Sequence, residues 1–174
     1  MLESLPEAFS EPEVLVAAVV VPILGLYAMG VWMGTTGRVV VYRNYYDIMI
    51  VGLLVILPVL FGSGMLFFQD HAAEAFEILF PTLVVLEAGV AVAILMRTWN
   101  DNRSVWKTLL ALYVKLPTGI LFFVQLIAVF QSDTRKERRQ SLLWTLLLLP
   151  LLYALVHDKS TGRLPGMPRG RTVY

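Results

Sequence analysis

The chain has 174 residues, of which 57% are hydrophobic and 16% charged, and its formal net charge at pH 7 is +1. Soluble domains average roughly 45–50% apolar and about 25% charged residues, so this composition argues against an ordinary soluble domain and indicates a membrane protein. The absence of cysteine excludes disulfides, thiol catalysis, iron–sulfur clusters and thiolate zinc sites.

The N-terminal segment, residues 1–13, is acidic and contains neither Lys nor Arg. A secretory signal peptide begins with a positively charged region, so the apolar run that follows is not predicted to be a cleaved signal. We expect residues 1–13 to form an acidic segment outside the cytoplasm.

Five apolar runs follow in the chain: Val14–Gly34, Ile48–Phe68, Ile78–Met96, Thr108–Phe130 and Ser141–Val156. A membrane-spanning helix needs about 20 apolar residues, with roughly 17–25 tolerated. The first four runs meet this length. The fifth is shorter and contains Pro150, so it is a tight span, a re-entrant segment or an interfacial helix. These patterns predict an all-α integral membrane protein, a bundle of five (or four) transmembrane helices over residues 14–156.

The distribution of basic residues predicts the orientation. Two early connections carry Lys or Arg, at Arg38, Arg43, Arg97, Arg103 and Lys107. The N-terminal segment and the connection 69–77 carry none. The positive-inside rule therefore predicts an N-terminus outside the cell and both basic connections in the cytoplasm.

The C-terminal third fits this rule less well. The connection 131–140 reads QSDTRKERRQ, and it lies outside if Thr108–Phe130 crosses the membrane. The basic residues of this connection stay in the cytoplasm only if neither Thr108–Phe130 nor Ser141–Val156 crosses the membrane fully. We favour five spans, which place the basic, Gly- and Pro-rich tail, residues 157–174, in the cytoplasm.

An internal duplication is a further hypothesis. An offset of 59 residues superimposes hairpin 78–130 on hairpin 14–68, and it aligns Pro22 with Pro81, Gly30 with Gly89, Arg38 with Arg97, and Pro58 with Pro117. Each hairpin has a pair of small residues four apart, Gly30 with Gly34 and Gly89 with Ala93. Such pairs allow close helix packing in membranes, so they are predicted packing positions. Two parallel copies of one hairpin would explain the match, and coincidence in a Leu- and Val-rich chain is the alternative.

Glu87 and Lys115 fall inside predicted spans, where charged side chains are costly and face protein or water. Both lie at a similar depth from the inner end of one antiparallel hairpin, so we expect them to pair. The functional interpretation is a proton or ion relay, or a docking charge for a partner helix. The alternative is a structural ion pair, or a lysine that reaches the headgroups. Gln125 adds a polar group that can form a hydrogen bond between helices.

No catalytic residue, metal site or cofactor is predicted. The chain has no HExxH motif, glycine-rich phosphate loop or nucleophile elbow, and its histidines, His71 and His157, belong to different runs. A basic surface is predicted at Arg135, Lys136, Arg138 and Arg139. Its functional interpretation is contact with anionic lipid headgroups, and its alternative is a determinant of topology.

These observations predict a non-catalytic integral subunit of a larger multi-protein complex in the cytoplasmic (inner) membrane. Its role would be to pack or anchor partner subunits. Membrane lipids are expected as further partners, and nucleic acid is not. A small transporter or channel component, with a polar path through Glu87 and Lys115, is the first alternative. A membrane enzyme acting on lipid-linked substrates, with loop arginines holding phosphate, is the second.

Overall fold

The structure, a computed structural model, describes residues 12–67 and 71–158. Within these residues the chain forms five helices: α1 (Pro12–Thr35), α2 (Tyr45–Phe67), α3 (Ala72–Asn102), α4 (Val105–Gln131) and α5 (Arg135–Leu155). Four of them, α1 to α4, are long and apolar enough to cross a membrane. The predicted all-helical fold is thus confirmed. Most of the acidic N-terminal segment and of the basic tail lies outside the described residues.

Each of the five helices has one proline in its interior: Pro22, Pro58, Pro81, Pro117 and Pro150. Proline removes one backbone hydrogen bond, which destabilises helices in water by about 3 kcal/mol. Neighbouring helices and local adjustments compensate this loss in membrane helices. The apolar character of the runs, and not the helix propensity of single residues, therefore explains these elements.

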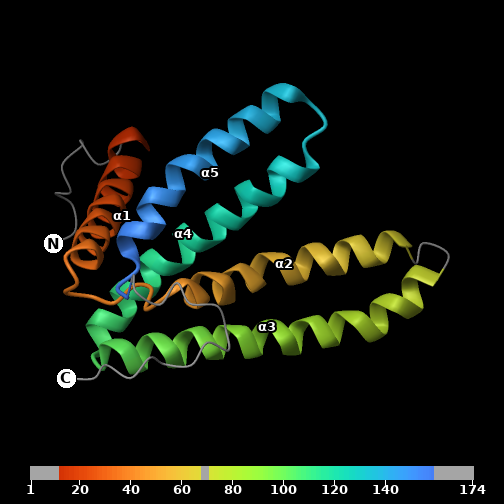
Figure 1. Cartoon of the computed structure of the whole chain (residues 1–174), viewed down its shortest axis with the longest axis horizontal. Coiled ribbons are helices and arrows are strands. Elements are labelled where there is room, and N and C mark those ends of the chain that lie inside the picture. Colours follow the sequence, from red (N-terminus) through yellow and green to blue (C-terminus); the bar gives the residue numbers. More distant parts are fainter. Residues whose placement is uncertain (1–11, 68–70, 159–174) are drawn as a thin grey trace, which may run out of the picture.

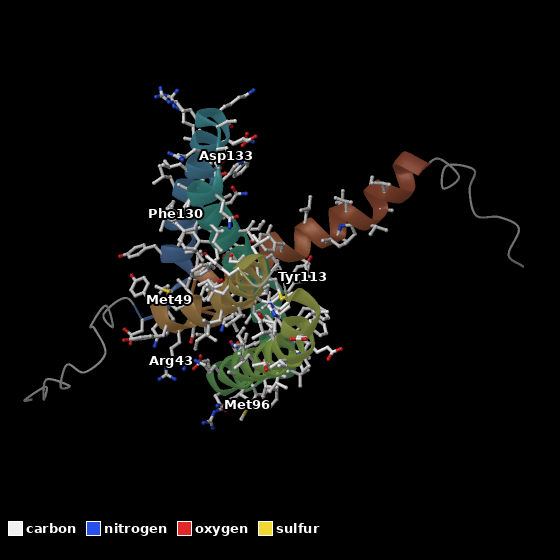
Figure 2. All side chains as sticks on the ribbon, turned by 90° about the vertical axis from the view of Figure 1, so that its right-hand side faces the viewer. Arg43, Met49, Met96, Tyr113, Phe130 and Asp133 are labelled. Atoms are coloured by element: carbon white, nitrogen blue, oxygen red, sulfur yellow. The ribbon has the colours of Figure 1, made fainter. Side chains whose placement is uncertain are left out.

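The helices radiate from a common end (Figures 1 and 2). Figure 1 shows two antiparallel hairpins, α2–α3 and α4–α5, that diverge from this end, and Figure 2 shows α1 leaving it in a third direction. We call this end the junction, formed by residues 36–44, 103–104 and 156–158. The C-terminal ends of α1, α3 and α5 and the N-terminal ends of α2 and α4 meet there.

Helix α4 is the central element. It contacts α1, α2, α3 and α5, and it has more buried residues than the other apolar helices. The most extensive contacts join α2 to α3 and α4 to α5. Helices α1 and α2, which form the first predicted hairpin, do not pack along each other; α1 instead packs against α4 and α5. The two predicted hairpins therefore differ in their packing.

Helix α5 begins six residues before the apolar run that predicts it, at Arg135 instead of Ser141. Thr134 is its N-cap and accepts a hydrogen bond from the backbone N–H of Glu137 at 3.3 Å. Ser or Thr followed three residues later by Glu is the sequence pattern of a capping box, which stabilises a helix start. The basic segment predicted as part of a connection is therefore the first turns of a helix.

The two pairs of small residues have different surroundings. A Cβ atom added at Gly30 would stand 2.5 Å from Cγ2 of Val114, so α1 and α4 approach closely there. At Gly34 the added atom would stand 2.7 Å from Cγ2 of Val41. At Gly89 no atom of another described element lies within 4 Å of the added Cβ, and Ala93 is half-buried. The close contact expected at Gly89 is thus not made within residues 12–67 and 71–158.

Candidate functional site

A buried polar cluster lies beside the junction, and Asp47 is its centre. Asp47 belongs to the first turn of α2, where Asn44 caps the helix by accepting from the backbone N–H groups of residues 46 and 47. The side chain of Asp47 turns back and accepts from the backbone N–H of Arg43 at 2.8 Å. A carboxylate at a helix N-terminus also interacts favourably with the helix dipole. Local hydrogen bonds at the start of α2 therefore contribute to the orientation of Asp47.

Two cations from two other helices approach Asp47. Arg97 of α3 donates from Nε to Oδ1 at 2.8 Å, and its Nη2 forms an ion pair with the same oxygen at 2.8 Å. Lys115 of α4 places Nζ 3.8 Å from Oδ2 and donates to Oγ1 of Thr98 at 2.8 Å. Asp47 and Lys115 are both only 2% exposed at the side chain, whereas Arg97 is 42% exposed. One carboxylate thus links α2, α3 and α4, and the trio carries one positive charge in excess.

Tyr42 connects this cluster to the rest of the junction. Its hydroxyl donates to the backbone carbonyl of Lys115 at 2.7 Å and lies 2.9 Å from Oγ1 of Thr118. Burial raises the pKa of this hydroxyl well above its usual range, so it stays protonated and able to donate. The backbone of Tyr42 pairs with the end of α5, accepting from the N–H of His157 at 2.8 Å. Connection 36–44 is therefore fixed to both α4 and α5.

A second set of polar contacts lies nearer the surface. The side-chain amide of Asn102 donates to the carbonyl and accepts from the N–H of Val40, both at 3.0 Å. Arg43 pairs with Asp101 at 3.0 Å, and its side chain is 63% exposed. Beside this pair a polar cavity of about 470 Å³ opens at the junction, lined by Val40, Arg43, Asn100, Asp101, His157 and Asp158.

The buried cluster encloses no room for a ligand. The space between Asp47, Arg97 and Lys115, closed by Ile50 and Ile94, does not admit a water molecule. Proton or ion conduction needs water or a continuous chain of polar groups. The geometry of this cluster is that of a structural link between three helices.

Glu87 is not the partner of Lys115. Asp47 and Thr98 occupy that position, and the Oε1 atom of Glu87 is buried with no hydrogen-bond partner among the described residues. The pairing expected from equal depth fails because equal depth does not determine which faces of two helices meet. The close polar neighbours of Lys115 come from the first turn of α2 and from the end of α3.

The other predicted site residues lie apart from this cluster. Gln125 is half-buried on α4, ten residues beyond Lys115, which is about 15 Å along the helix. Arg135, Lys136, Arg138 and Arg139 are exposed at the far end of the α4–α5 hairpin. The structure therefore does not bring Glu87, Lys115 and Gln125 together into one path.

Sequence reasoning missed Asp47, Tyr42 and Thr98. The predicted orientation and the hypothesis of a duplication both use Arg97, and its hydrogen bond to Asp47 is a finding of the structure. A signal for Asp47 existed: it is an acidic residue directly before an apolar run, in a connection otherwise rich in basic and aromatic residues.

In the part of the chain that the structure describes, no three His, Cys, Asp or Glu residues lie close enough to hold a metal ion. Comparisons with protein-family models, with curated proteins and with solved structures found no match.

Proposed function

We propose that this protein is a non-catalytic integral subunit that packs or anchors partner subunits of a larger complex in the cytoplasmic membrane. The observation that carries the proposal is that α3 presents groups without a partner among the residues that the structure describes. Gly89 faces open space, and one oxygen of Glu87 is buried without a donor among the described residues.

A comparison of the two pairs of small residues supports this proposal. Gly30 and Gly34 have side chains of other elements within 3 Å of an added Cβ, which is how such pairs are used in membrane proteins. The second pair, Gly89 with Ala93, is of the same kind but has no close contact at Gly89. A helix from another chain can approach α3 at Gly89 as closely as α4 approaches α1 at Gly30.

Glu87 supports the same conclusion on energetic grounds. An unpaired polar group in an apolar environment costs several kcal/mol, and a charged one costs more. The position 87 lies about 200° around the helix from 89, so Glu87 and Gly89 mark different faces of α3. A donor from a partner subunit would satisfy the carboxyl group of Glu87. The closed cluster at Lys115 gives no comparable support to a transport path.

The subunit proposal is tested by purifying the tagged full chain from its native membrane in a mild detergent. We expect partner chains to co-purify in stoichiometric amounts, and Gly89→Leu to lower their yield about tenfold or more. The isolated chain should keep its thermal stability, because no atom lies within 4 Å of the added Cβ. Quantitative mass spectrometry of the eluted chains measures the result.

Gly62→Leu on α2 is the matched control, since Gly62 also has no atom within 4 Å of an added Cβ. It should leave the partner yield unchanged. A chain that purifies alone or only with copies of itself would contradict the proposal, and so would a Gly89→Leu variant that retains its partners.

We further propose the orientation that the basic residues predict, with the junction in the cytoplasm and α5 crossing the membrane. In support, residues 36–44, 103–104 and 156–158 lie together at the junction, and both hairpins lead away from it. Single cysteines can report this arrangement because the chain has none of its own.

In intact cells, an impermeant thiol reagent should label Ala73→Cys and Asp133→Cys and should not label Ser104→Cys. All three should be labelled after permeabilisation, which controls for accessibility. Labelling of Ser104→Cys in intact cells, or protection of Ala73→Cys, would reverse the proposed orientation. Protection of Asp133→Cys alone would show that the α4–α5 hairpin does not cross.

A further inference from the structure

The far tip of the α4–α5 hairpin carries an unbalanced positive charge. Residues 133–139 include four basic and two acidic side chains, which leaves a net charge of +2. Within the described residues, no ion pair involves any of the four cations. In Figure 2 this tip is marked by Phe130 and Asp133, and nitrogen-ended side chains project outward from it.

The helix itself does not favour these cations. Basic residues at a helix N-terminus oppose the helix dipole, which favours anions there. Glu137 and the Thr134 cap stabilise the first turn of α5, so the helix start does not need the arginines. An anion bound beside them would remove the electrostatic cost.

A groove lies at the same place, which we call the tip groove. It has a volume of about 360 Å³ and is lined by Arg135, Arg138, Arg139, Leu142 and Leu143. Positions 135, 138, 139 and 142 share one face of a helix, so the groove leads from charged groups to leucines along α5. Its walls are apolar, because arginine side chains present their aliphatic stems and carry the charge at the end.

The apolar surface continues beyond the groove. Leu142 and Leu143 are 44% and 60% exposed, and Leu146, Leu147 and Leu149 are also exposed. Trp144 lies at the start of this surface and is 51% exposed. Tryptophan is enriched at the level of the lipid headgroups, with apolar residues on the membrane side of it. Along α5 the basic residues come first, and Leu142, Leu143, Trp144 and the further leucines follow them. Charge therefore gives way to apolar surface in the same direction as from the headgroup to the acyl chains of a lipid.

We propose that the tip groove binds one anionic phospholipid. The guanidinium groups of Arg135 and Arg139 hold the phosphate of the headgroup, since arginine forms paired hydrogen bonds to phosphate oxygens. Arg138 lines the same wall and donates to the carbonyl of Ser132 at 3.2 Å, which orients it. The beginning of an acyl chain lies on Leu142 and Leu143. This binding does not depend on a partner subunit.

The test uses the purified full chain in a neutral detergent and counts bound lipids by native mass spectrometry. The probes are dioleoyl phosphatidylglycerol, dioleoyl phosphatidylcholine, which has the same acyl chains, and glycerol 3-phosphate, which has no chains. We expect phosphatidylglycerol to bind about thirtyfold more tightly than phosphatidylcholine, whose choline cation offsets the phosphate charge, because two basic groups act on the net negative headgroup. Glycerol 3-phosphate should not displace it.

The double variant Arg135→Gln with Arg139→Gln should lower phosphatidylglycerol binding to the level of phosphatidylcholine. Arg103→Gln with Lys107→Gln is the matched control, because it removes the same charge from exposed positions at the junction. Equal binding of the two lipids by the unmodified chain would overturn the proposal. Displacement by glycerol 3-phosphate would overturn the lipid groove in favour of a phosphate site. An equal loss in the control would show that total charge, and not the groove, attracts the lipid.

Discussion

Asp47→Ala should destabilise the protein by about 3 kcal/mol or more, because it leaves the buried ammonium of Lys115 without a counter-charge. The Arg97 side chain is 42% exposed and can turn toward water, but Lys115 is only 2% exposed and cannot. For a chain of this length such a loss lowers the melting temperature by roughly 6–12 °C. Thermal unfolding in detergent, followed by size-exclusion chromatography, measures the shift.

Asp101→Ala is the control for this substitution. It breaks the pair with Arg43, whose side chain is 63% exposed, and exposed pairs contribute about 0–1 kcal/mol. If Asp47→Ala is no more harmful than Asp101→Ala, the buried cluster is not the structural link proposed for it.

Removing both charges extends this experiment. Lys115→Met alone should be mild, since Asp47 keeps its contacts with Arg97 and with the backbone of Arg43. Combining Lys115→Met with Asp47→Ala should recover much of the loss, because the double variant no longer buries an unpaired ammonium. Glu87→Ala should not reproduce the effect of Asp47→Ala. The opposite result would restore Glu87 as the partner of Lys115.

Gly119→Ala should destabilise the protein by about 1–3 kcal/mol, the usual cost of overpacking a core. The added Cβ would stand 2.5 Å from Cγ1 of Val51 and 3.0 Å from the hydroxyl oxygen of Tyr42. It therefore pushes α2 away from α4 and disturbs the hydrogen bonds of Tyr42. The same thermal assay measures this effect.

The sign of the change makes this substitution informative. In a helix interior Ala is favoured over Gly by about 1 kcal/mol, so propensity alone predicts stabilisation. Gly62→Ala, at a position with no atom within 4 Å of the added Cβ, should show that stabilisation or no change. A Gly119→Ala variant as stable as the unmodified chain would mean that α2 and α4 are not in close contact there.

The amino-acid sequence by itself determined the four long apolar helices and the all-helical fold. Hydropathy and length are local properties, and spanning the apolar layer requires a helix whatever its neighbours are. The capping pattern of Thr134 and Glu137 also indicates the start of α5. Hydropathy alone predicts this start six residues too late. A search for apolar runs leaves out the charged residues with which a helix can begin.

Only the tertiary structure decided which helix faces meet. Gly30 and Gly89 belong to the same sequence pattern, yet among the helices that the structure describes Gly30 lies against another helix and Gly89 does not. Lys115 and Glu87 lie at similar depths in neighbouring helices, yet Lys115 contacts Asp47 and Thr98. Pairing depends on the rotation of each helix about its axis, which packing around α4 sets. No local feature of the sequence records that rotation, because the contacts that fix it join residues dozens of positions apart.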